Sequence, residues 1–101
     1  FVTIIIPTYN RKELLEKAVL SVLSQKQDIP FEHEIIIIDD GSKDGTEEFI
    51  REHVNNPLNH IIYRYQENGG VGKARNHGLS LMNQKSDYLI FLDIYFIVKY
   101  F

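Results

Sequence analysis

The chain has 101 residues, of which 44% are hydrophobic and 25% are charged, so it can form one small domain with a core. This length excludes most complete two-domain enzymes. It contains no cysteine, which excludes a disulfide framework, a thiolate zinc site and a cysteine nucleophile. A net charge of −3 gives no general attraction to nucleic acid, and no apolar run approaches the ~18–20 residues of a membrane helix. We therefore expect one cytoplasmic domain with no membrane span and no nucleic-acid partner.

Four apolar segments of strand length alternate with three helical patterns, beginning and ending with a strand. The second segment contains four consecutive isoleucines, and such a continuous apolar run is typical of a strand buried on both faces. Between residues 14 and 23, apolar side chains recur at the three-to-four spacing of one helix face. The expected strands are Phe1–Ile6, Glu34–Ile38, Ile61–Tyr65 and Tyr88–Leu92.

The starts of the first two helices carry possible capping signals. Asn10 and Glu13 have the spacing of a capping pair for the first helix. Asp44 and Glu47 have the same spacing before a second helix, which should cover about residues 46–53.

The third helix should begin near Val71, with Ala74 and Gly78 on the side that faces the sheet. These two small residues would let the helix pack close to the sheet. Strands that alternate with helices form parallel sheets, and right-handed crossovers place the helices on the sheet faces. The predicted fold is therefore an α/β domain, a Rossmann-like three-layer α/β/α sandwich with a mostly parallel sheet.

Polar residues follow the predicted strands at their carboxyl ends, where open parallel sheets bind ligands. Tyr9 could stack on a base, and an aspartate after the second strand could accept the imide N–H of uracil. Glycines before the third helix would let backbone N–H groups approach a diphosphate. Asp93 could hold a divalent metal against the same phosphates. Together these groups predict a nucleotide site.

Each of these groups also has a purely structural interpretation. Residues 39–42 could form only a turn, because Asp, Gly and Ser are turn residues. Tyr9 could be a half-buried aromatic residue and Asn10 a helix cap, while Lys73 and Arg75 could lie on a solvated helix face. The joint occurrence of the groups, and no single one, favours nucleotide binding.

Two phosphate-loop motifs are present only in part. Residues 70–72 begin G-x-G-x-x-G, but Arg75 occupies the third glycine position and the motif follows the third strand instead of the first. Residues 68–74 are similar to the loop of partition-type ATPases, but Asn68 and Ala74 replace its first lysine and its magnesium-binding hydroxyl. An ATPase is the least favoured function.

Four blocks of the chain, in this order, resemble the sequence blocks of the family-two glycosyltransferases. These enzymes have the GT-A fold, which is the fold of nucleotide-diphospho-sugar transferases. The resemblance extends over nearly the whole chain up to Asp93, in order and at the spacing of the family. The blocks are Ile4–Asn10, Ile36–Thr46, Asn68–Gly70 with Ala74–Gly78, and Tyr88–Asp93.

This resemblance implies a nucleotide-sugar donor, usually a uridine diphosphate sugar, and transfer to a saccharide or other hydroxyl acceptor. It implies an inverting displacement assisted by a carboxylate base and by Mg²⁺ or Mn²⁺. The base belongs to the other half of the family's domain, so no catalytic residue is expected here. The implied nucleotide contacts are Pro7, Thr8, Tyr9, Asp40, Gly70 and Arg75, and the implied metal ligand is Asp93.

The sequence departs from the family pattern directly after Asp93. The family's metal-binding D-x-D needs a further aspartate, whereas this chain continues with Ile94 and Tyr95, and a tyrosine does not replace a carboxylate on a hard cation at neutral pH. We expect residues 1–93 to form the nucleotide-sugar-binding part of a truncated domain that binds metal weakly or not at all. Residues 94–101 should be an atypical apolar tail that promotes homo-oligomers.

Two functions stay open at this point. The first is a glycosyltransferase domain that binds a nucleotide sugar but is weakly active or inactive as this chain. The second is a noncatalytic nucleotide-binding or interaction module, or a folded remnant without a ligand. Binding of uridine diphosphate (UDP) that depends on Asp40 would favour the first, and a folded chain that binds no nucleotide would favour the second.

Overall fold

A computed structural model describes residues 1–24, 32–54 and 60–93 of the chain. In these ranges four parallel strands form one sheet in the order β3-β2-β1-β4. The predicted parallel sheet and its four strands are confirmed, although the first strand continues beyond Ile6. The strands are β1 (Val2–Thr8), β2 (His33–Asp39), β3 (Ile61–Tyr65) and β4 (Tyr88–Phe91).

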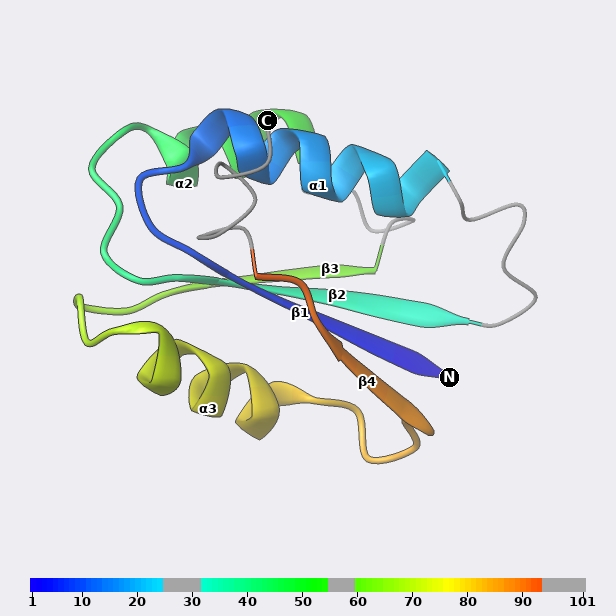
Figure 1. The fold of residues 1–101 in the computed structure, drawn as a ribbon. Helices are drawn as coiled ribbons and strands as arrows, with labels where there is room; N and C mark the ends of the chain where they lie inside the picture. Colours follow the sequence, from blue (N-terminus) through cyan, green and yellow to red (C-terminus); the bar gives the residue numbers. More distant parts are fainter. Residues whose placement is uncertain (25–31, 55–59, 94–101) are drawn as a thin grey trace.

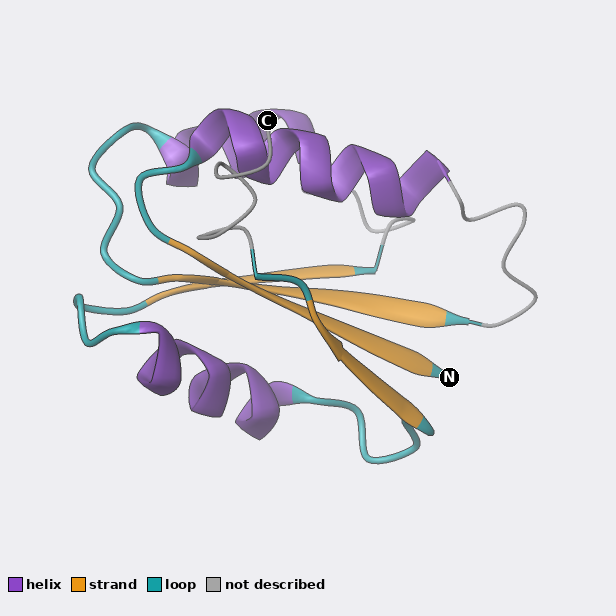
Figure 2. Cartoon of the chain, viewed as in Figure 1, coloured by secondary structure: helices purple, strands orange, loops and turns teal. Residues whose placement is uncertain are grey.

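Helices cover both faces of the sheet, which confirms the predicted three-layer sandwich. The helices α1 (Lys12–Ser24) and α2 (Thr46–Phe49) lie on one face, and α3 (Val71–Leu81) lies on the other (Figure 1; Figure 2). The second helical segment changes character within its predicted range, because Ile50–Val54 form a π-helical turn, η1.

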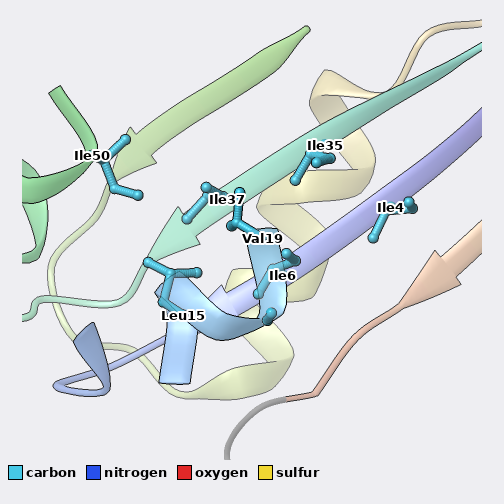
Figure 3. Packing of buried hydrophobic residues seen from close by; sticks show 8 residues of the cluster. Ile4, Ile6, Leu15, Val19, Ile35, Ile37 and Ile50 are labelled. Carbon is cyan, nitrogen blue, oxygen red and sulfur yellow. The ribbon is translucent and has the colours of Figure 1, made fainter. Parts of the chain in front are cut away.

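The four isoleucines of β2 explain why this strand lies inside the sheet. Successive side chains of a strand point to opposite faces, and all four isoleucines are fully buried. Ile35 and Ile37 pack on the α1 side, whereas Ile36 and Ile38 pack on the α3 side. Figure 3 shows the first cluster, in which the labelled residues are Ile4, Ile6, Leu15, Val19, Ile35, Ile37 and Ile50.

Pro7 is tolerated inside β1 because the ladder beside it is incomplete. A proline has no backbone N–H to donate, so it normally avoids the centre of a sheet. The pairing of β1 with β4 ends at Ile5, whose carbonyl accepts the N–H of Leu92, and Pro7 pairs in register only with Ile38 of β2. The missing donor therefore breaks no bond to β4.

The β4 strand is an edge of the sheet and is poorly covered. All four of its residues are exposed, from 36% for Leu89 to 68% for Tyr88. Within the ranges that the structure describes, no helix has the length and apolar character needed to cross a membrane. The apolar tail at residues 94–101, and the self-association expected from it, lie outside the described residues.

We predict that Gly78→Ala destabilises the domain by about 1–3 kcal/mol, because overpacking a core forces its neighbours to move. A Cβ atom at Gly78 would lie 2.6 Å from Cγ2 of the buried Ile5. The matched control is Gly72→Ala in the same helix, where a Cβ atom meets nothing within 4 Å. Urea unfolding followed by circular dichroism should show stability that is unchanged or raised by about 0.4–1 kcal/mol for the control. Equal effects of the two substitutions would contradict close packing at Gly78.

Candidate nucleotide-binding site

The strand order places a topological switch point between β1 and β4. The chain passes from β1 to β2 and β3 on one side, and then returns through α3 to β4 on the other side of β1. Open parallel sheets bind ligands outside the carboxyl ends of the strands at such a point. Tyr9 directly follows β1, and Asp93 is the second residue after the end of β4.

The consecutive aspartates at the end of β2 serve opposite faces of the sheet. Asp39, on the face of Ile37, accepts hydrogen bonds from the Tyr63 hydroxyl and from the backbone N–H of Ser42. Burial raises the pKa of Tyr63 far above its ordinary value, and the bond to Asp39 raises it further. Tyr63 is therefore a hydrogen-bond donor at any physiological pH.

Asp40 ties the end of β2 to the loop that begins α3. Its Oδ1 accepts hydrogen bonds from Gln66 Nε2 and from the Gly69 N–H, each at 2.8 Å, and its Oδ2 accepts the Gly70 N–H at 2.9 Å. The residue is only 2% exposed. A carboxylate offers about four acceptor sites, so these three bonds leave capacity for one more donor.

Gln66 and His77 support this arrangement, and sequence analysis did not predict either as a site residue. The Oε1 atom of Gln66 lies 2.9 Å from Nδ1 of His77. Because an amide oxygen only accepts, this contact requires the proton on Nδ1. A glutamine after a strand carries no distinctive sequence signal, and His77 is half-buried.

Gly41 lets the loop after β2 approach the loop before α3. Its φ is +91°, and a Cβ atom there would lie 3.0 Å from the backbone nitrogen of Asn68. The side-chain amide of Asn68 donates to the carbonyl oxygen of Asp40 at 3.1 Å. The glycine at this position is therefore required by both its backbone conformation and its contact.

Arg75 and Asp93 form an ion pair at the end of β4. Arg75 Nη2 lies 2.7 Å from Asp93 Oδ2, and the guanidinium carbon lies 5.7 Å from the centroid of the Phe91 ring. The Nε of Arg75 is buried without a hydrogen-bond partner. Helix α3 thus brings the guanidinium of Arg75 to the carboxyl end of β4.

The described residues offer few ligands for a divalent cation. No group of three or more His, Cys, Asp or Glu side chains that could hold a metal occurs in residues 1–24, 32–54 and 60–93. Asp93, the expected ligand, is already engaged by the guanidinium of Arg75. Mg²⁺ takes one or two protein carboxylates together with substrate phosphates and water, and the candidate carboxylate of this site is held by a guanidinium instead.

Thr8 is the most unusual residue at the end of β1. It is fully buried, and its Oγ1 has no hydrogen-bond partner among the described residues. Its carbonyl oxygen accepts the N–H of Asp40 at 2.8 Å, which joins the ends of β1 and β2. Tyr9 follows and is half-buried. A buried hydroxyl without a partner is uncommon and marks a position that a ligand or a water molecule can satisfy.

The two predicted capping pairs are wrong, because the loops after β1 and β2 cap each other. Asn10 accepts the backbone N–H of Lys43 at 2.8 Å, and Asp44 accepts the backbone N–H of Lys12 at 3.1 Å. The N-cap of α2 is Gly45, which has a left-handed backbone and makes no side-chain capping bond. Neighbouring parallel strands place their loops side by side, so these bonds join residues far apart in sequence.

The parallel sheet with helices on both faces defines an α/β domain of the Rossmann-like type. A comparison with protein families identifies the family within this class. The family profile described as Glycosyl transferase family 2 matches residues 3–94. The chain belongs to this family, as its sequence blocks predict.

Individual relatives agree with this assignment. The minor teichoic acid biosynthesis protein GgaA of Bacillus subtilis (strain 168) is 38% identical over 91 residues, which make up 90% of this chain and 20% of that protein. S. aureus TarS 1-349 in complex with UDP-GlcNAc aligns with a TM-score of 0.65 at 27% identity, over 91% of this chain and 26% of that one.

A second similar structure holds a metal. The mannosyltransferase PcManGT from Pyrobaculum calidifontis, in complex with GDP-Man and Mn²⁺, has a TM-score of 0.69 at 27% identity, over 81% of this chain and 24% of that one. The chain spans about a fifth of the length of GgaA and about a quarter of each of these two solved chains.

We predict that Asp44 makes the stability of the domain sensitive to acid. Burial raises its pKa, but the hydrogen bonds from the Thr46 hydroxyl and the Lys12 N–H outweigh it and leave the pKa below the ordinary 3.8. A depressed folded-state pKa gives stability that is present above the unfolded pKa and is lost as the pH falls through the folded one.

Chemical unfolding should therefore show a steeper loss of stability for the wild type than for Asp44→Asn between about pH 5 and pH 2. At neutral pH, Asp44→Asn should be less stable than the wild type. Glu48→Gln, at an exposed acid of α2, serves as the control and should follow the wild type. Identical pH profiles for all three proteins would refute the role of Asp44.

Proposed function

We propose that this domain binds the donor of a glycosyltransferase, a nucleotide-diphosphate sugar of the uridine type, for inverting transfer to a saccharide or other hydroxyl acceptor. Membership of glycosyl transferase family 2 supports the reaction class. The similar structures with UDP-GlcNAc and UDP support the donor class.

The observation that carries the proposal is the set of three hydrogen bonds on Asp40. They fix Gly69 and Gly70 directly before α3, where Gly70 is the N-cap with φ +94°. The two glycine N–H groups are then occupied by Asp40. The free N–H groups of the first turn of α3, together with Arg75, are the donors that would meet a diphosphate.

The uracil base of the donor would lie beside the ends of β1 and β2, next to the phosphates. Tyr9 offers an aromatic ring for stacking, and the remaining acceptor capacity of Asp40 suits the imide N–H of uracil. The hydroxyl of Thr8, buried without a partner, is a further group for the nucleotide to satisfy. Pro7 fixes the backbone from which Thr8 and Tyr9 extend.

The role of these residues is to bind and orient the donor. The guanidinium of Arg75 would offset charge that develops on the leaving diphosphate. The base that deprotonates the acceptor hydroxyl belongs to the part of the family's domain beyond Asp93. Residues 1–93 thus constitute the donor-binding part.

We predict that the domain binds UDP and that Asp40→Ala weakens this binding at least about tenfold, a change of ~1.4 kcal/mol, because the Gly69–Gly70 segment loses its acceptor. Isothermal titration calorimetry measures the affinity, with GDP and ATP as competing nucleotides. Glu48→Gln should bind like the wild type.

A noncatalytic function is the competing proposal, and the ion pair between Arg75 and Asp93 is the observation that favours it. If the folded wild type binds none of the three nucleotides, the donor-binding function is refuted. Preference for ATP over UDP would refute the uridine donor and support a phosphate-loop protein.

We also predict that Thr8→Val weakens UDP binding without lowering the stability of the fold. Valine has the shape of threonine without the hydroxyl, so replacing an unsatisfied buried hydroxyl should leave stability unchanged or raise it. UDP binding should weaken by about three- to tenfold if the hydroxyl meets the nucleotide. Thr8→Ser, which keeps the hydroxyl, should retain more of the affinity. Unchanged affinity in Thr8→Val would exclude Thr8 as a contact.

A further inference from the structure

Arg75 would face two anions once a nucleotide binds. In the free domain its guanidinium pairs with Asp93 at 2.7 Å and lies against the ring of Phe91. The same guanidinium is the side-chain cation that the proposed site aims at a diphosphate. Asp93 and the diphosphate therefore both act on one positive charge.

A divalent cation between the two anions would turn this arrangement into an attractive one, but the described residues offer it at this place only Asp93, which is already paired with Arg75. No cluster of three acidic or histidine side chains occurs among them, and the sequence continues after Asp93 with Ile94 and Tyr95. With no cation between them, the carboxylate of Asp93 and the phosphates carry like charges and repel.

We propose that Asp93 in this chain is an anionic competitor for Arg75 and lowers the affinity for a nucleoside diphosphate, which binds without a divalent metal. This inference rests on the proposed donor-binding function. The inference reverses the expected effect of replacing Asp93 on nucleotide affinity. Removing a metal ligand weakens nucleotide binding, whereas removing a competitor strengthens it.

The geometry of Arg75 allows the exchange of partners. A guanidinium has five N–H groups in a planar fork, which suits bidentate contact with phosphate. The bond to Asp93 is made by Nη2, and the buried Nε has no partner. The side chain is 37% exposed, so a ligand can reach it. The Phe91 ring supports the planar group in either state.

The test is calorimetric titration of UDP into the wild type, Asp93→Asn, Arg75→Gln and the double variant, with a chelator and with Mn²⁺. We expect Asp93→Asn to bind UDP about three- to tenfold more tightly than the wild type. The gain should vanish when Arg75 is also replaced. Mn²⁺ should change the wild-type affinity by less than about twofold.

Two controls isolate the charge at Asp93. Uridine lacks phosphates, so its affinity should be the same in the wild type and in Asp93→Asn. Asp87→Asn removes another carboxylate, an exposed one directly before the amino end of β4, and should bind UDP like the wild type. Circular dichroism verifies folding, and Asp93→Ser provides a second substitution with the same expected sign.

Weaker UDP binding by both Asp93 variants, or wild-type binding that requires Mn²⁺, would overturn this inference while leaving the donor-binding function intact. A gain that persists in the Arg75→Gln background would also overturn it, because the competition would not act through Arg75. If no folded variant binds UDP, the proposed function itself fails, and this inference fails with it.

Discussion

The carboxylate of Asp40 is the group on which the rest of the site depends. It is nearly inaccessible to solvent, and it accepts three hydrogen bonds from the segment between β3 and α3. Hydrogen bonds to a charged acceptor are stronger than neutral ones, and a buried N–H left without an acceptor costs about 1–3 kcal/mol. The single carboxylate therefore fixes both the position of Gly70 and the start of the helix that carries Arg75.

The pleat of β2 lets one strand organise two loops. Asp39 and Asp40 are adjacent in sequence but serve opposite faces, so the first holds Ser42 and Tyr63 while the second holds the loop before α3. The four buried isoleucines before them anchor β2 between the helix layers on both faces of the sheet, so the strand end that precedes the two loops is held in place. The packing of the core thus fixes the position of the two aspartates at the end of this strand.

Local sequence patterns were sufficient to predict the sheet, its parallel direction and the close packing of Gly78, because each depends on side-chain period or size. They failed at the loops. The capping rules assume that a side chain near a helix start serves that helix, whereas the sheet brings Asn10 to Lys43 and Asp44 to Lys12. Gln66 had no signal at all, since its role depends on the position of Asp40.

The two ends of the proposed nucleotide site differ in how well the strands that carry them are buried. Thr8 ends β1 and Asp40 directly follows β2, two central strands whose isoleucines are buried on both faces, so the side of the site that would bind the nucleotide base is preorganised. Asp93 follows β4, an edge strand whose residues are all exposed, and Phe91 of that strand contacts Arg75. Segments with little buried apolar area open most readily. A ligand that engages Arg75 therefore acts beside the most exposed strand of the sheet. On this phosphate side of the proposed site, charge should decide affinity more than preformed shape does.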